Sequence, residues 1–245
     1  MKLNCDLGES FGAWKMGLDE HVMPHIDMAN IACGFHAGDS DVIANTLVLA
    51  KHNDVEIGAH PSYPDKQGFG RRSIALSKDE LTNCLHYQIA AIEGMAKVHG
   101  LTLSYVKPHG ALYNDMMADD AILHTVMGAI ARYSPLLKLM ILATAKAQEH
   151  KQLATQYGIT LILEAFADRQ YTDEGQLVSR NIAGSVHNKV AILAQVNQLL
   201  IDGTVTTNSG NKVTLNADSL CVHGDNADGI ALIKDIKALC INAKS

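Results

Sequence analysis

Residues 101–143 read LTLSYVKPHGALYNDMMADDAILHTVMGAIARYSPLLKLMILA, in which two short apolar runs flank an amphipathic segment. The runs at 101–106 and 139–143 are rich in Leu, Ile and Val, which is typical of buried parallel strands. Between them, apolar residues recur with helical spacing over 123–130, and Pro135 ends the pattern. The stretch therefore predicts a strand, a helix and a second strand parallel to the first.

The same alternation extends over the rest of the chain. Apolar runs that predict further strands lie at 3–7, 31–35, 55–59, 159–163 and 220–222. The amphipathic segments between them predict helices. Seven such units without an obvious linker favour a single-domain α/β fold over residues 1–245, a closed or nearly closed, TIM-like seven-stranded β/α barrel. An open, doubly wound sheet is the alternative.

Local signals mark several helix ends and one departure from the alternation. Ser77-Lys-Asp-Glu80 is a capping box, in which each side chain satisfies a backbone N–H group at the other end of the box. Ser185 is a candidate cap for a later helix. Residues 204–215, TVTTNSGNKVTL, have turn residues between two β-prone runs. This stretch predicts a hairpin excursion before the last strand.

The composition excludes several classes of protein. The 245 residues include 20 Lys and Arg against 26 Asp and Glu, a net charge of −6, which argues against a general nucleic-acid binder. The five cysteines are odd in number and form no CxxC pair, so neither a disulfide scaffold nor a zinc knuckle is indicated. No apolar stretch is long enough to span a bilayer, and the first residues lack a signal-peptide core. We therefore expect a cytoplasmic protein that uses neither nucleic acid nor a membrane as a partner.

Polar side chains follow the predicted strands where each one ends. In a β/α barrel the carboxyl ends of all strands converge on one face, and that face holds the active site. The sequence therefore predicts a single cluster from residues far apart in the chain. Its histidines are His36, His60, His109 and His223, and its carboxylates are Asp6, Glu164 and Asp225.

The two-residue period of a strand adds two residues to this cluster. Alternate side chains of a strand point to the same face, so Asn4 accompanies Asp6 and Lys107 accompanies His109. Pro108 favours extended backbone at Lys107. A lysine at the end of a buried strand, two residues before a histidine, is uncommon as surface decoration. These residues are consequently added to the candidate site.

Several familiar catalytic motifs do not occur. The chain has no P-loop pattern GxxxxGK[ST], no GxGxxG after a strand, and no GxSxG elbow. The segment 68–72, Gly-Phe-Gly-Arg-Arg, could hold an anion, but it lacks the Lys-Ser/Thr pair of a P-loop. The chain alone therefore offers no recognisable nucleotide site.

Long sequence blocks nevertheless resemble one known family. They read NCDLGESFG, ANIACGFHAGD, GAHPSYPD, GFGRR, VKPHGALYN, FADR and CVHGD, and lie at 4–12, 29–39, 58–65, 68–72, 106–114, 166–169 and 221–225. Together they resemble the LamB/YcsF family, which supplies one of the subunits of bacterial 5-oxoprolinase, the one designated A. The resemblance runs from the first predicted strand to the last.

The resemblance implies a barrel of the glycoside hydrolase/deacetylase type. It also implies ATP-dependent hydrolytic opening of 5-oxoproline, or pyroglutamate, to L-glutamate. In that family picture two partners, the B and C subunits, phosphorylate the lactam, and the LamB/YcsF chain completes the ring opening. ATP would then be a co-substrate of the complex.

Opening a lactam requires a base for water, an acid for the departing nitrogen and donors for the developing oxyanion. Asp6 is the first candidate for the general base and Glu164 the second. His60 and His109 are candidate proton shuttles. Lys107 is a candidate for stabilising the oxyanion or a phosphoryl oxygen.

A second set of residues is expected to bind the substrate. Arg169 suits a carboxylate or phosphate because its guanidinium group forms two parallel hydrogen bonds. His223 and Asp225 are a candidate orienting pair, and Asn4 and His36 complete the set.

Two other functions stay open at this point. Asp6, His36 and His60 are the ligand types of an Asp-His-His deacetylase site, where a divalent metal would activate water in an amidohydrolase. Alternatively, the chain could bind the lactam without catalysing its opening, leaving the chemistry to its partners.

Overall fold

A closed barrel of seven parallel strands forms the centre of the protein, in the order β1-β2-β3-β4-β5-β6-β9. This computed structural model describes residues 1–223 and 227–242. Strand β9 pairs with both β6 and β1, which closes the sheet on itself. The seven-stranded barrel expected from the sequence is confirmed. The strands are β1 (Lys2–Leu7), β2 (Met28–Ala32), β3 (Glu56–His60), β4 (Leu103–Val106), β5 (Lys138–Leu142), β6 (Leu161–Phe166) and β9 (Ser219–Val222).

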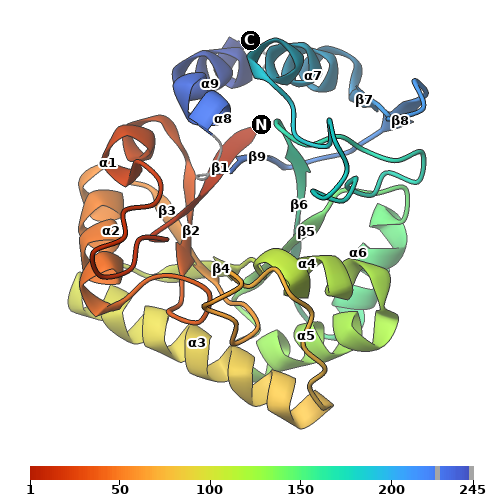
Figure 1. Ribbon diagram of the computed structural model, residues 1–245. Helices are drawn as coiled ribbons and strands as arrows, with labels where there is room; N and C mark the ends of the chain where they lie inside the picture. The colour runs from red at the N-terminus through yellow and green to blue at the C-terminus, as the bar shows by residue number, and fades with distance from the viewer. Residues whose placement is uncertain (224–226, 243–245) are drawn as a thin grey trace.

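Helices encircle the barrel, as Figure 1 shows along its axis. The described helices are α1 (Asp19–Val22), η1 (Met23–His25), α2 (Ser40–His52), α3 (Lys78–Val98), α4 (Gly110–Ala118), α5 (Asp120–Tyr133), α6 (Ala147–Gln156), α7 (Lys189–Asp202), α8 (Ala227–Ala231) and α9 (Ile233–Asn242). The predicted capping box of α3 is present in both directions. The hairpin stretch forms an antiparallel pair, β7 (Thr204–Thr206) with β8 (Lys212–Thr214), outside the barrel.

The second strand lies earlier in the chain than the sequence suggested. It covers Met28–Ala32 rather than 31–35, so His36 lies in the following loop. All five strand residues are buried, including Asn30, whose polarity inside an otherwise apolar strand obscured the pattern. Gly34, with φ of +86°, turns the chain away immediately after the strand.

Two helix predictions were also incomplete. Helix α7 is capped by Asn188, whose side chain accepts a hydrogen bond from the N–H of Ala191, and not by Ser185. Ser185 is buried, and its carbonyl accepts from the N–H of Gln170. Helix α4 was not anticipated, because residues 110–118 show little helical periodicity.

Alternate strand residues face two different environments. Outward residues such as Leu3 and Ile57 belong to the main core between barrel and helices. Inward residues at one level of the barrel form a separate apolar cluster. Its members are Met28, Tyr105, Met140 and Ile162. The Tyr105 hydroxyl donates to the Asn30 side chain at 2.7 Å, so this apolar level supports the polar residues next to it.

The described residues include no helix that is both long and apolar enough to cross a membrane.

Gly58 should be required for this interior packing. A Cβ atom at Gly58 in β3 would overlap the buried ring of Tyr105. We expect Gly58→Ala to lower the free energy of unfolding by about 1–3 kcal/mol, the usual cost of overpacking a core. Gly94→Ala is the matched control, because Gly94 lies exposed in α3 with open space around it. That substitution should stabilise the protein by up to about 1 kcal/mol. Urea unfolding of both variants measures the difference, and equal stability of the two would contradict the packing argument.

Candidate active site

Lys107, just after β4, lies at the centre of a buried ionic cluster. Its Nζ atom is 3.0 Å from Asp6 Oδ1 and 3.0 Å from Glu164 Oε2. It also lies 3.4 Å from Asn4 Oδ1 and 3.2 Å from Cys221 Sγ. All five side chains are buried. The ammonium group therefore joins β1, β6 and β9 to the end of β4 inside the barrel.

Lys107 and Asp6 keep their charges despite burial. Burial alone would lower the pKa of Lys107, but the Asp6 and Glu164 carboxylates and the Cys221 sulfur raise that pKa well above its usual value. Burial likewise opposes ionisation of Asp6, yet Lys107 and His60 hold the pKa of Asp6 well below normal. Lysine and carboxylate consequently form a true ion pair at neutral pH.

Two asparagines orient the acidic partners of Lys107. Asn30 Nδ2 donates to Asp6 Oδ1 and to Asn4 Oδ1, both at 2.8 Å. Asn4 Nδ2 donates to Ser219 Oγ at 2.8 Å and to Glu164 Oε2 at 3.4 Å. These amides add hydrogen bonds to the Asp6, Asn4 and Glu164 oxygens that Lys107 contacts, whereas the buried Glu164 Oε1 has no hydrogen-bond partner among the described residues.

A histidine pair lies beside the ionic cluster. His60 Nδ1 is 2.7 Å from the Lys107 carbonyl oxygen, and His109 Nε2 is 2.9 Å from the Phe69 carbonyl oxygen. Because carbonyls only accept, both of these nitrogens must carry hydrogen. The two remaining nitrogens, His60 Nε2 and His109 Nδ1, face each other at 3.0 Å. Two lone pairs therefore face each other, and a cation between them would remove their repulsion.

Glu9 and His36 extend the histidine pair to a group of four. His36 Nε2 lies 3.3 Å from Glu9 Oε1, which is 3.7 Å from His109 Nδ1. The His36 and His109 rings stack with centroids 3.7 Å apart. Burial, reinforced by the neighbouring histidines, holds the pKa of both rings well below normal, which favours neutral imidazoles.

The glycine-rich segment 68–72 lies against the histidines. Phe69 has a φ of +53°, an uncommon backbone for a non-glycine residue, and its carbonyl receives the His109 hydrogen bond. A Cβ atom on Gly70 would lie 2.8 Å from His36 Cβ and 2.9 Å from His109 Cδ2. Arg72 forms an ion pair with Asp65 that holds the turn together. The segment thus supports the histidine rings by close approach of its backbone.

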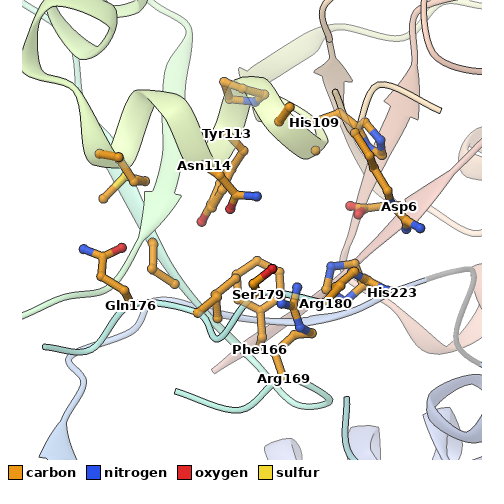
Figure 2. Close-up of a pocket in the computed structure, with 18 of the residues that line it drawn as sticks. Asp6, His109, Tyr113, Asn114, Phe166, Arg169, Gln176, Ser179, Arg180 and His223 are labelled. Carbon is orange, nitrogen blue, oxygen red and sulfur yellow. The ribbon is translucent and has the colours of Figure 1, made fainter. Parts of the chain in front are cut away.

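A cavity of about 700 Å³ opens in front of this network. Figure 2 shows Tyr113 and Asn114 of α4 on one side and Arg169, Ser179 and Arg180 on the other. Its cationic lining residues are Arg71, Lys107, Arg169 and Arg180, and its only carboxylate among the described residues is Asp6. The cavity therefore favours an anionic ligand.

Arg169 is the most buried of the cavity arginines. Its Nη2 donates to the Val178 carbonyl at 2.6 Å, while its buried Nε has no protein partner. Burial and the nearby Arg180 lower the pKa of Arg169 to about 10. A bound carboxylate or phosphate would satisfy the unused donor and offset the repulsion between the guanidinium groups.

His223 lies on the same cavity, paired with an acid that sequence reasoning did not single out. Its Nδ1 lies 2.9 and 3.1 Å from the two carboxylate oxygens of the fully buried Asp168. The His223 ring stacks on Phe166, with ring centroids 5.0 Å apart. The stacking holds the ring in place, and the Asp168 carboxylate accepts a hydrogen bond from Nδ1. The Nε2 atom therefore stays available for proton transfer.

The structure divides the predicted site residues into three groups. Those that line the cavity are Asp6, His60, Lys107, His109, Arg169 and His223. Asn4, His36 and Glu164 are buried but do not line it. Asp225 lies outside the described residues.

Sequence reasoning missed Glu9 and Asp168, although both lie inside the blocks at 4–12 and 166–169. Neither follows a strand directly, so the strand-end rule did not select them. The metal ligands proposed from sequence are also not brought together as one set. Asp6 is 3.5 Å from His60, but it groups with Cys221 and His223, whereas His36 and His60 group with Glu9 and His109.

Comparison with known proteins agrees with the sequence blocks. Residues 1–244 match the LamB/YcsF family. The chain belongs to the LamB/YcsF family. A relative from Vibrio parahaemolyticus, named as the A subunit of 5-oxoprolinase, is 51% identical over 238 residues, which cover 97% of this chain and 94% of that protein. A Pseudomonas putida relative, also named as a 5-oxoprolinase A subunit, is 51% identical over 96% of this chain and 92% of its own length.

Solved structures place this LamB/YcsF chain among known barrels. The lactam utilization protein of Thermus thermophilus superposes with a TM-score of 0.89 at 34% identity, covering 100% of this chain and 97% of that one. A putative cellobiose-phosphate cleavage protein of Enterococcus faecalis shares the fold alone, with a TM-score of 0.53 and 9% identity. That alignment covers 99% of this chain and 94% of the other.

Lys107→Met should destabilise this LamB/YcsF barrel strongly at neutral pH. The variant leaves two buried carboxylates without their cation, a loss of about 3–5 kcal/mol in the free energy of unfolding. Lys151→Met, on the exposed side of α6, is the matched control and should change stability little.

The pH dependence of the Lys107→Met variant gives a sharper result. In the wild type, the folded pKa of Asp6 is lowered and that of Lys107 raised. Their mutual stabilisation is therefore constant between about pH 5 and 9, and it is lost either as pH falls through the folded pKa of Asp6 or as pH rises through the folded pKa of Lys107. In the variant, one buried carboxylate takes up a proton in the native state, so acidification from pH 7.5 to 5 should recover part of the stability. Urea unfolding at both pH values measures this, and an equal pH response of variant and wild type would refute it.

Proposed function

We propose that this chain is the ring-opening subunit of an ATP-dependent 5-oxoprolinase, which hydrolyses 5-oxoproline to L-glutamate. The observation that carries the proposal is about 51% identity over nearly the whole chain to proteins named as 5-oxoprolinase A subunits. The word subunit in those names implies further chains, and we propose that these are the B and C subunits. The anion-favouring cavity beside Lys107 is consistent with this substrate, because 5-oxoproline carries one carboxylate.

Lys107 is suited to stabilise negative charge that develops on the lactam carbonyl oxygen. Its ammonium group is held by Asp6 and Glu164 at 3.0 Å each, yet it also lines the cavity. A donor that is already oriented costs no reorganisation during the reaction. The same group can contact a phosphoryl oxygen if the lactam arrives activated.

The Asp168–His223 pair is suited to proton transfer. Asp168 holds His223 through Nδ1 and leaves Nε2 to accept a proton from water or to deliver one to the departing nitrogen. Asp6, the first base considered from sequence, has a pKa held well below normal, so it accepts a proton poorly in the resting site. We therefore propose His223 as the acid–base group, and Asp6 as the residue that holds Lys107 and faces His60.

The arginines are suited to bind the substrate carboxylate. Arg169 offers its buried Nε, and Arg71 and Arg180 line the same cavity. The cavity volume of about 700 Å³ exceeds what a single small lactam requires, so a larger activated form of the substrate can enter.

Reconstitution tests the proposed function directly. The chain alone should neither hydrolyse ATP nor open 5-oxoproline, because its sequence has no P-loop and an amide carbonyl needs activation. Addition of the B and C subunits should restore both reactions, coupled to each other. Glutamate release and phosphate release measure the coupling. Ring opening by the isolated chain without ATP would refute the coupled reaction.

Substitution of His223 tests the acid–base proposal. We expect His223→Gln and Asp168→Asn to lower kcat in the assembled complex by about 100-fold or more, with a smaller change in KM. His52→Gln, on the exposed end of α2, is the matched control and should leave both parameters unchanged. If Asp6→Asn abolished turnover while His223→Gln did not, the base would be Asp6.

Two further candidate functions make different predictions in the same assays. A metal-dependent amidohydrolase would open the ring without ATP, and the group of Glu9, His36, His60 and His109 is the observation that favours it. A lactam-binding protein without catalytic groups would keep full turnover in the His223→Gln and Asp168→Asn variants.

A further inference from the structure

Four buried side chains at the carboxyl ends of β1, β2, β3 and β4 direct one donor atom each to a common point. They are Glu9, His36, His60 and His109, and their donor atoms all lie within 4.8 Å of one another. The four residues are between 1% and 6% exposed. No sequence pattern of short ligand spacing marks this group, because consecutive barrel strands supply its members.

Three of the six separations between these donor atoms are close to those of tetrahedral coordination. Zinc–nitrogen and zinc–oxygen bonds of about 2.0–2.1 Å place neighbouring ligand atoms about 3.4 Å apart. The observed neighbours are His60 Nε2 to His109 Nδ1 at 3.0 Å, His36 Nε2 to Glu9 Oε1 at 3.3 Å, and His109 Nδ1 to Glu9 Oε1 at 3.7 Å. Small shifts of side chains would bring all three to the tetrahedral edge length.

Surrounding carbonyl groups fix the tautomers of two of the three histidines in the form that metal binding requires. His60 Nδ1 donates to the Lys107 carbonyl and His109 Nε2 donates to the Phe69 carbonyl, which leaves the facing nitrogens with lone pairs. Metal-ligating histidines in proteins are held by such outer hydrogen bonds. A cation between these lone pairs removes their repulsion, and Glu9 supplies a balancing negative charge.

We propose that Glu9, His36, His60 and His109 bind one zinc-like divalent transition-metal ion. Three imidazoles and one carboxylate favour zinc or a similar ion over Mg²⁺ and Ca²⁺, which prefer oxygen ligands. This site differs from the Asp6, His36 and His60 set expected from sequence. A metal there would supply Lewis acidity at the cavity wall, since His60 and His109 line the cavity.

The proposed site explains the conformation of segment 68–72. The positive φ of Phe69 aims its carbonyl at His109, and Gly70 allows the backbone to lie directly on the His36 and His109 side chains. Strained backbone persists where surrounding structure enforces it and is common at ligand sites.

Metal titration of the purified full chain tests the proposal. After treatment with a chelator, the protein should bind one Zn²⁺ or Co²⁺ per chain, and the Co²⁺ form should show the visible spectrum of a tetrahedral nitrogen and oxygen site. Binding should also raise the melting temperature. His36→Gln and Glu9→Gln should each weaken metal affinity by more than about 100-fold. Loss of a residue that only hydrogen-bonds a ligand typically costs about 10–100-fold. His52→Gln is the matched control and should bind like the wild type.

Several outcomes would overturn the proposal. One is no stoichiometric binding by the wild type, and another is unchanged affinity in both His36→Gln and Glu9→Gln. A thiolate-to-cobalt absorption band that disappears in Cys221→Ser would place the ion at Asp6, Cys221 and His223 instead. Circular dichroism of each variant establishes folding, and two independent ligand variants keep the test decisive if one misfolds. The inference does not rest on the lactam reaction, so metal binding and ATP-coupled ring opening can each fail separately.

Discussion

The buried contact of Lys107 with Asp6 and Glu164 is the constraint on which the rest of the site depends. A lone ammonium group inside the barrel would be too costly, and so would two neighbouring carboxylates without a cation. Each side chain is tolerated only because the others are present, and Asn30 and Asn4 donate further hydrogen bonds to Asp6 and Glu164. Because the Lys107 carbonyl also holds His60, the ionic cluster and the histidines share one piece of backbone.

Much of this arrangement could be predicted from the sequence. Short apolar runs separated by amphipathic segments led to seven parallel strands. The strand-end rule then selected Asp6, His60, His109 and His223, the two-residue period of a strand added Lys107, and all five line one cavity. That rule works because a barrel brings the carboxyl ends of all its strands to one face, so residues far apart in the sequence lie close together. The bounds of β2 were predicted wrongly, because the polar Asn30 lies inside the strand and interrupts the apolar run from which strands were predicted.

The remaining parts depend on geometry that spacing does not encode. Glu9 and Asp168 come from loops, and only the folded backbone determines that one reaches His36 and the other His223. The directions of the His60 and His109 rings depend on the carbonyl groups of Lys107 and Phe69, which no residue type reveals. Sequence could thus identify most of the chemically active side chains but not their partners.

The arginines of the cavity have a consequence for how ligands reach it. The chain has a net charge of −6, so a small anion is repelled by the molecule as a whole. The cavity itself is locally positive, because its lining includes Arg71, Arg169 and Arg180. The low dielectric constant of the cavity walls concentrates the electric field of these arginines at the opening. The protein would thus guide anions toward one entrance by long-range electrostatic steering. Dissolved salt, which screens charges over about 8 Å at physiological strength, would weaken this guidance and slow encounter.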